Sequence, residues 1–206
     1  MNKRLLTIMC VALWTTSFLI NAGDDHTMAD NAHGHQMAMV KTDAHTQALA
    51  RELTPAALRV SKTVQLNVAP EKAFALVSDH EGLPKLVPNI HEVSVDNSKA
   101  SMKNGKGCVR TCSFADGGKL VEDIVAWNPG KSYAYAIRSG NPMSLEHHLG
   151  VFHVKSDGMG GSLVTWSTYF NHPMPEQVTP NIGMLMSMVL EKLVVQNGGK
   201  MMASAN

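Results

Sequence analysis

Hydrophobic and polar residues alternate at the start of the segment 64–88, which reads VQLNVAPEKAFALVSDHEGLPKLVP. This period of two predicts a strand with one buried face. Pro70 ends the strand and suits the first turn of a helix, which the apolar spacing around Phe74 also predicts. Gly82 and Pro84 break that helix, and a second, shorter helical turn follows. The segment therefore predicts one strand and two short helices.

Downstream of this segment, strand-like runs alternate with turn residues up to one long helical segment. Asn-Gly, Asp-Gly and Asn-Pro-Gly turns separate neighbouring runs, and such short connections favour antiparallel hairpins. Apolar residues at helical spacing predict a final helix over residues 176–195, ended by Gly198 and Gly199. The predicted strands are 90–95, 107–114, 119–127, 133–137, 145–154 and 162–170.

Three stretches match a known family in this order of elements. They read VAPEKAFALVSDHEGLPKLVP, GCVRTCSFADGGKLVEDIVAWNPGKSYAYAI and GSLVTWSTYF. Together they resemble the START-like, SRPBCC superfamily, most closely its polyketide cyclase/dehydrase-type members. The resemblance implies an α+β helix-grip fold, in which a curved antiparallel sheet wraps around a long C-terminal helix, with two short helices after the first strand. It also implies an apolar cavity between the sheet and that helix.

Two residues depart from the pattern of this family. Leu86 stands where relatives often carry tryptophan, and His148 stands where a tyrosine is expected. Both positions usually help to line the pocket. The identity of the ligand therefore does not carry over from the family.

The amino-terminal part of the chain is predicted to lie outside this domain. Residues 1–22 have a basic start, an uncharged apolar core and a small-residue exit. This is the pattern of a cleaved export signal, with an uncleaved membrane anchor as the alternative. Residues 23–39 contain no valine, isoleucine, leucine or aromatic residue, so the segment 23–50 is expected to be flexible. A short helix over residues 48–60, interrupted by Pro55 with Thr54 available as its cap, is expected before the domain, residues 59–202. The mature protein is thus predicted to be periplasmic or secreted, without a stable membrane anchor.

The flexible segment is rich in histidine and methionine and is a candidate metal site. Cleavage before Asp24 would make His26 the third residue of the mature chain. The free amine, two backbone amides and the imidazole would then form a square-planar site suited to Cu(II) or Ni(II). His33 and His35 offer further ligands. The alternative is a solvated tether, and no other cofactor is expected.

The two cysteines of the predicted domain lie four residues apart in one strand. That spacing separates the α-carbons of Cys108 and Cys112 by about 13 Å, beyond the reach of a disulfide. An intrachain bridge would need a break in the strand. Both cysteines are therefore predicted to be small buried hydrophobic residues.

Two polar residues in the predicted strands are candidates for a site. Glu122 shares its strand parity with Ile124 and Ala126, so it faces either an apolar interior, where it could act as acid or base, or the outer surface. His147 and His148 are adjacent and must face opposite sides of the sheet. We expect His148 to point inward, either as a paired core histidine or as a catalytic group.

The expected pocket has apolar walls and one polar group, the usual composition of a small-molecule site. Glu122 or His148 is the expected polar group. Trp127 and three methionines of the last helix are expected in the core first and in the ligand wall second: Met184, Met186 and Met188. The predicted wall residues are Phe74, Leu86, Phe152, Trp166, Leu185 and Val189.

Three functions remain open from the sequence. The favoured one is an exported binding protein that holds a lipid-like or other apolar small molecule. The second is a polyketide cyclase/dehydratase-like enzyme with Glu122 and His148 as its acid–base pair. The third is copper binding in the periplasm through the histidine-rich segment. The formal net charge of +1, without a basic cluster, excludes the usual nucleic-acid-binding surface, and the oligomeric state is left open.

Overall fold

A computed structural model describes residues 42–203 of the chain, with the helices and strands in the predicted order. The expected export signal and residues 23–41 lie outside the described residues. The elements are α1 (Ala44–Leu53), β1 (Leu58–Leu66), α2 (Pro70–Val77), α3 (Leu83–Leu86), β2 (Ile90–Asp96), β3 (Val109–Phe114), β4 (Lys119–Asn128), β5 (Ser132–Ser139), β6 (Glu146–Ser156), β7 (Ser162–Asn171), α4 (Pro175–Asn197) and β8 (Gly199–Met201).

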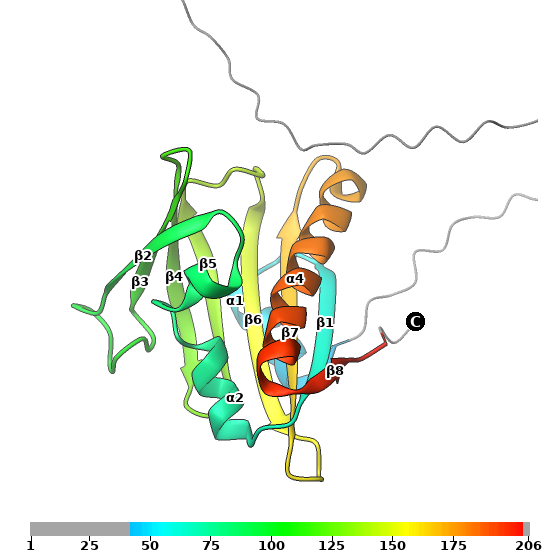
Figure 1. The fold of residues 1–206 in the computed structure, drawn as a ribbon. Coiled ribbons are helices and arrows are strands. Elements are labelled where there is room, and N and C mark those ends of the chain that lie inside the picture. The colour runs from blue at the N-terminus through cyan, green and yellow to red at the C-terminus, as the bar shows by residue number, and fades with distance from the viewer. Residues whose placement is uncertain (1–41, 204–206) are drawn as a thin grey trace, which may run out of the picture. The chain divides into compact units, whose positions relative to one another are not determined.

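All the strands belong to one antiparallel sheet, which curves around α4 (Figure 1). The strand order is β2-β3-β4-β5-β6-β7-β1-β8, a meander from β2 to β7 with β1 added beside β7. The predicted α+β helix-grip fold is confirmed. The three-residue β8, which the sequence did not predict, pairs with β1 at one edge of the sheet.

The helix pair after β1 closes one end of the space between the sheet and α4. Pro70 starts α2, and the buried side chains of Ala73, Phe74 and Val77 face the core. Helix α2 packs against β6 and β7, whereas α3 packs against β2 and α4. These contacts place Leu86, the one buried residue of α3, beside the core.

Helix α4 presents its apolar stripe to the sheet along most of its length. The buried residues recur at helical spacing, and Gly198 caps the helix with a φ of 71°, a conformation that favours glycine. Met186 is buried, but Met184 and Met188 are exposed. The prediction that all three methionines lie in the core was wrong because residues 184 and 188, one turn apart, share the solvent side. The buried residues are Ile182, Met186, Val189, Leu190 and Leu193.

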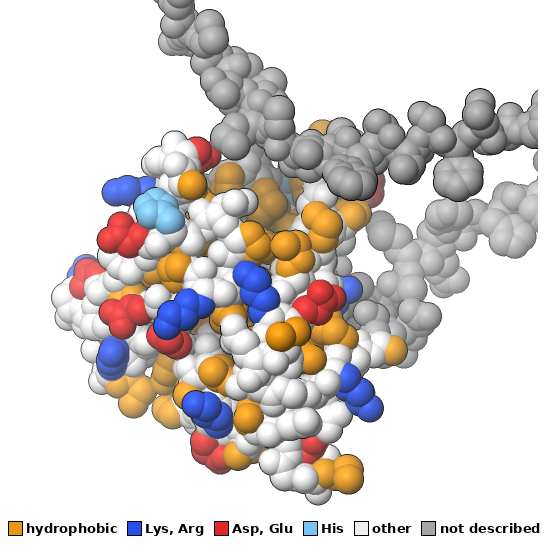
Figure 2. Space-filling model, in the orientation of Figure 1, with side chains coloured by type: hydrophobic (Ala, Val, Ile, Leu, Met, Phe, Trp, Pro, Cys, Tyr) orange, Lys and Arg blue, Asp and Glu red, His pale blue; other side chains and the backbone are white. Residues whose placement is uncertain are grey.

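By length and hydropathy alone, α4 is the one helix within residues 42–203 that could span a membrane. Its buried side chains pack against β1 and the core. On the face shown in Figure 2, hydrophobic side chains are interspersed with charged groups of both signs. This mixture agrees with the net charge of +1.

Helix α1 covers the face of the sheet opposite α4. Ala50 belongs to a separate outer cluster with side chains of β5, β6 and β7, and Asp43 caps the helix by accepting a hydrogen bond from the backbone of Thr46 at 3.1 Å. Residues 44–50, which were predicted to belong to the flexible segment, instead form most of α1. Thr54 follows the end of α1 and does not cap a later helix.

A bulge in β4 reverses the alternation of its side chains. Ile124 lies opposite Tyr135, whereas Ala126 lies opposite Ala134, with one extra residue between the two pairs. Glu122 is therefore buried on the inner face beside Ile124, while Ala126 packs with the outer cluster. The predicted shared face of Glu122 and Ala126 was wrong because a bulge shifts strand parity by one residue.

Cys108 and Cys112 are both buried, and neither forms a disulfide. The prediction that both are small buried residues is confirmed. The two thiols act as small core groups, although Cys112 also reaches the cavity described below.

Candidate functional site

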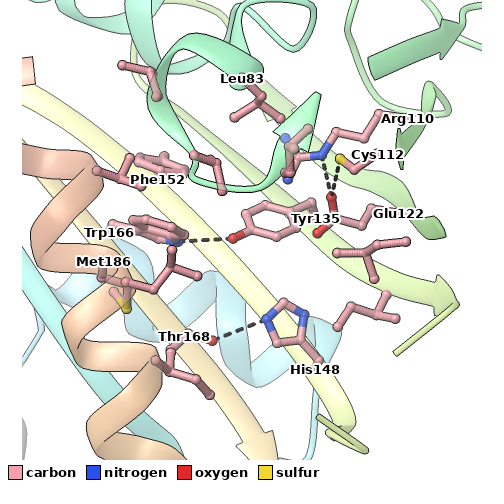
Figure 3. A pocket seen from close by; sticks show the side chains of 18 of the residues that line it. Leu83, Arg110, Cys112, Glu122, Tyr135, His148, Phe152, Trp166, Thr168 and Met186 are labelled. Carbon is pink, nitrogen blue, oxygen red and sulfur yellow. Dashed lines mark hydrogen bonds and ion pairs between the residues drawn. The ribbon is translucent and has the colours of Figure 1, made fainter. Parts of the chain in front are cut away.

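A cavity of about 140 Å³ lies between the inner face of the sheet and α4 (Figure 3). Its wall is largely apolar and includes side chains from α3, α4 and the central strands. Seven of the eight residues predicted to bind a ligand line this cavity. They are Leu86, Glu122, His148, Phe152, Trp166, Leu185 and Val189.

Phe74 is the one predicted wall residue that does not line the cavity. Its ring packs edge-on against Trp127, with 5.2 Å between ring centroids, and against Tyr133 at 6.4 Å. These two aromatic rings surround it within the core. The prediction for Phe74 was wrong because a helical face alone does not show whether a strand side chain fills the adjacent space.

Glu122 forms a buried ion pair with Arg110, its cross-strand neighbour on β3. The Nε of Arg110 donates to Oε2 of Glu122 at 2.6 Å, and the two side chains are only 5% and 6% exposed. Burial disfavours the charged guanidinium, but the charge of Glu122 outweighs this effect and holds the pKa of Arg110 above its ordinary value. The two charges therefore neutralise each other inside the protein.

His80, in the turn after α2, completes this buried cluster. Burial and the positive charge of Arg110 lower the pKa of His80 to about 3, so its ring is neutral. Its Nε2 lies 3.3 Å from the backbone oxygen of Asn104, and its Nδ1 lies 3.2 Å from Nη1 of Arg110. Because a carbonyl only accepts, Nε2 carries the hydrogen and Nδ1 accepts from Arg110. His80 thus accepts a hydrogen bond from the guanidinium of Arg110 and helps to fix its position.

Tyr135 forms the floor between the ion pair and the apolar wall (Figure 3). The guanidinium of Arg110 lies 4.3 Å from the centre of its ring, a cation–π distance. The hydroxyl oxygen accepts a hydrogen bond from Nε1 of Trp166 at 3.1 Å. A Cβ at Gly150 would collide with the Tyr135 ring. Glycine at this position of β6 therefore makes room for the tyrosine.

His148 reaches the cavity from an irregular start of β6. His147 has a φ of 52°, and the pairing of β6 with β7 shifts register between Glu146 and Leu149. The carbonyl of His147 accepts a hydrogen bond from the hydroxyl of Thr54 at 2.7 Å. The outcome is that His147 is exposed while His148 lines the cavity.

The polar atoms of His148 are only partly satisfied. Its Nε2 lies 3.2 Å from the hydroxyl of Thr168, and its Nδ1 is buried without a hydrogen-bond partner in the described part of the chain. Burial lowers the pKa of His148 to about 4, although the charge of Glu122 opposes this shift. The ring is therefore neutral near pH 7, and its Nδ1 lacks a hydrogen-bond partner among the described residues.

Cys112 and Tyr133, which line the cavity, are not activated as nucleophiles. Burial and the nearby charge of Glu122 raise the pKa of Cys112 to about 12, so its thiol stays protonated. Burial likewise raises the pKa of Tyr133 to about 12. The groups in the wall are thus suited to hydrogen bonding with a ligand rather than to covalent attack.

Three important residues escaped the sequence analysis: His80, Arg110 and Tyr135. Arg110 stands midway between Cys108 and Cys112, so strand parity alone puts a guanidinium among apolar side chains. That pattern was a usable signal for a buried partner of Glu122. No pattern in the sequence pointed to His80, because it lies in a turn and meets Arg110 only through the fold.

The predicted metal ligands His26, His33 and His35 lie outside the described residues. Metal binding there stays a prediction. Within residues 42–203, no group of three or more histidine, cysteine or carboxylate side chains could hold a metal ion. A deletion that tests the segment should end at residue 41, since Thr42 and His45 contact the sheet through Ser167 and Ser132.

Comparisons with known proteins agree with this architecture. A family model described as polyketide cyclase / dehydrase and lipid transport matches residues 57–199. The protein XoxI from Bacillus cereus is 21% identical, with a TM-score of 0.56 over 67% of this chain and 94% of its own. A norcoclaurine synthase mutant from Thalictrum flavum, in complex with a transition-state analogue, is 16% identical, with a TM-score of 0.52 over 69% and 96%.

The major latex-like protein 151 from Panax ginseng is a further structural relative. It is 16% identical, with a TM-score of 0.50 over 67% of this chain and 95% of its own. No curated protein gives a significant match. At these levels of identity, the structural similarities show the fold alone.

Proposed function

This chain belongs to the polyketide cyclase/dehydrase and lipid transport family, and on that basis we propose that it is an exported binding protein for an apolar small molecule. The observation that carries the proposal is the cavity of about 140 Å³ between the sheet and α4, whose wall is apolar except for a few polar groups. Such a composition is typical of small-molecule sites. The ligand lies against the aromatic side chains of Phe152 and Trp166.

Binding has more support than catalysis. In the alternative function, a cyclase or dehydratase, Glu122 and His148 exchange protons with a substrate. A general acid or base works best with a pKa near the operating pH, whereas the pKa of His148 is lowered to about 4. Glu122 is already paired with Arg110. The similarity to norcoclaurine synthase, at 16% identity, does not transfer that reaction.

Export is the second part of the proposal. It is supported by the basic, then apolar, then small-residue pattern of residues 1–22. Amino-terminal sequencing of the protein from its native cells tests it. A mature chain that begins at Gly23 or Asp24 is expected, and an intact Met1 in a membrane fraction would contradict export.

The binding function can be tested with fluorobenzene, a probe small enough for the cavity, by ¹⁹F NMR. The full-length chain is expected to broaden and shift the fluorine signal. Val189, which is 3% exposed in the cavity wall, is then replaced by tryptophan to fill the space. Val189→Trp should abolish the effect on the probe.

A matched control lies on the same helix. Val195 is 85% exposed, so Val195→Trp adds the same side chain to α4 without entering the cavity. This variant should bind fluorobenzene like the unmodified protein. Loss of binding in both variants, or in neither, would contradict a binding site between the sheet and α4.

A further inference from the structure

The space between the sheet and α4 has room for about one ring. Sites for drug-sized ligands have volumes of roughly 300–1,000 Å³, whereas an engineered cavity of about 150 Å³ in another protein binds benzene. The cavity here measures about 140 Å³. A two-chain lipid or a polycyclic compound would have to extend beyond this space.

The charges around the cavity favour a neutral ligand. Arg110 and Glu122 pair with each other at 2.6 Å, and His80 contacts the guanidinium from another side. A carboxylate on the ligand would approach Glu122 without a free cation to pair with, and an ammonium group would face Arg110. Burying either charge without its own partner is costly.

The unpartnered Nδ1 of His148 identifies the polar group of the ligand. If the hydroxyl of Thr168 donates to Nε2, then Nδ1 carries a hydrogen and needs an acceptor. If Nε2 donates to Thr168, then Nδ1 is a bare acceptor and needs a donor. A hydroxyl group both donates and accepts, so it satisfies His148 in either tautomer.

The aromatic walls determine the rest of the ligand. The rings of Phe152 and Trp166 stack with 4.8 Å between centroids and an interplanar angle of 20°, and both line the cavity. The hydroxyl of Tyr135 accepts from Trp166, which leaves its own hydrogen for a ligand oxygen. A flat ring therefore has aromatic surfaces to pack against, next to groups that bind a hydroxyl.

We propose that the cavity selects small neutral aromatic compounds with one hydroxyl group, of the size of phenol, and that His148 binds that hydroxyl. This inference rests on the proposed binding function and narrows its ligand class. It assigns His148 as the residue that determines specificity. The apolar wall alone would bind any molecule of this size.

The test is competition against fluorobenzene on the full-length chain, observed by ¹⁹F NMR. Phenol, benzene, benzoate and 1-decanol are the competitors. Phenol is expected to displace the probe with a dissociation constant at least fivefold below that of benzene, and benzoate and 1-decanol should displace it poorly. Equal affinities for phenol and benzene, or displacement by 1-decanol but not by phenol, would overturn the proposal.

Two adjacent histidines supply the variants. His148→Leu should raise the dissociation constant of phenol about tenfold, the usual effect of one lost hydrogen bond, and leave that of benzene unchanged. His147→Leu, on the exposed neighbour, should change neither. An unaltered phenol-to-benzene ratio in His148→Leu would refute the role of His148.

Failure of this inference and failure of the binding function give different results. If fluorobenzene does not bind to the unmodified chain, the binding function itself is wrong. If fluorobenzene binds and the dissociation constants of phenol and benzene are equal, the cavity binds apolar molecules but does not select a hydroxyl. The comparison of phenol with benzene needs no variant, so a poorly folded His148→Leu does not prevent a decision.

Discussion

The two faces of β4 carry neighbouring carboxylates with opposite surroundings. Glu122 faces the cavity and pairs with Arg110, and both side chains are at most 6% exposed. Asp123 faces outward and pairs with Arg138, whose Nε donates to Oδ2 at 3.0 Å, with side chains that are 33% and 53% exposed. The same chemical pair is thus present twice, one residue apart.

The comparison shows that surroundings, rather than residue type, decide how much a pair contributes. A surface ion pair contributes about 0–1 kcal/mol because water screens it. Removal of one partner from a buried pair leaves a charge without compensation and costs about 3–5 kcal/mol.

The largest expected effect comes from breaking the inner pair. Glu122→Ala should lower the free energy of unfolding by about 3–5 kcal/mol, because Arg110 stays buried and charged. Asp123→Ala, on the next residue, should cost less than about 1 kcal/mol. Urea unfolding monitored by circular dichroism measures both values.

A double replacement sharpens this test. Arg110→Met combined with Glu122→Leu removes both charges and keeps the space filled, so much of the lost stability should return. Equal costs for Glu122→Ala and Asp123→Ala would mean that burial does not distinguish the two pairs.

The second effect is the pH dependence of the inner histidines. The pKa of His80 is lowered to about 3 and that of His148 to about 4, from a value of 6.5. Between these values and pH 6.5 the unfolded chain binds more protons than the folded protein, so stability is complete above pH 6.5 and falls as the pH drops.

Each of these two histidines should cost about 2 kcal/mol of stability between pH 7 and pH 5. Urea unfolding at the two pH values measures the sum. His148→Leu should remove about half of the pH dependence. A stability that is equal at pH 7 and pH 5 would show that His80 and His148 are protonated in the folded protein.

The third effect concerns the space beside Gly150 that the ring of Tyr135 occupies. Gly150→Ala should cost about 1–3 kcal/mol through overpacking, because its Cβ would displace Tyr135. Gly183→Ala on α4 is the control, since its Cβ would meet Val60 at an ordinary 3.7 Å. That variant should stabilise the protein by about 0.5–1 kcal/mol. Thermal unfolding measures both variants. An unchanged melting temperature in Gly150→Ala would contradict the close packing of Tyr135.

The smallest effect is expected on the outer face. Asp43→Ala removes the cap of α1 and the contact with His153, and should cost about 1 kcal/mol. Burial alone would raise the pKa of Asp43, but the hydrogen bonds from His153 and Thr46 outweigh it and hold the pKa well below 3.8. This contribution is therefore present at neutral pH and is lost only as the pH falls below 3.8. Urea unfolding at pH 7 checks it, and a cost as large as that of Glu122→Ala would erase the contrast between the faces.

The sequence by itself determined the elements and their order, because these depend on neighbouring residues. The period of two in the strands, Pro70 at the start of α2 and Gly198 at the end of α4 are local signals, and β2 to β7, α2 and α4 lie within a few residues of their predicted positions. The same local alternation put Phe152 and His148 on one face of β6, and both line the cavity.

Only the tertiary structure decided which side chains meet. The bulge in β4 placed Ala126 on the outer face, and an aromatic cluster around Phe74 excluded that residue from the cavity wall. Arg110 reaches Glu122 through strand register, and His80 reaches Arg110 across 30 residues of sequence. Register and long-range packing arise from competition among many weak contacts over the whole fold, so no local pattern of residues specifies them.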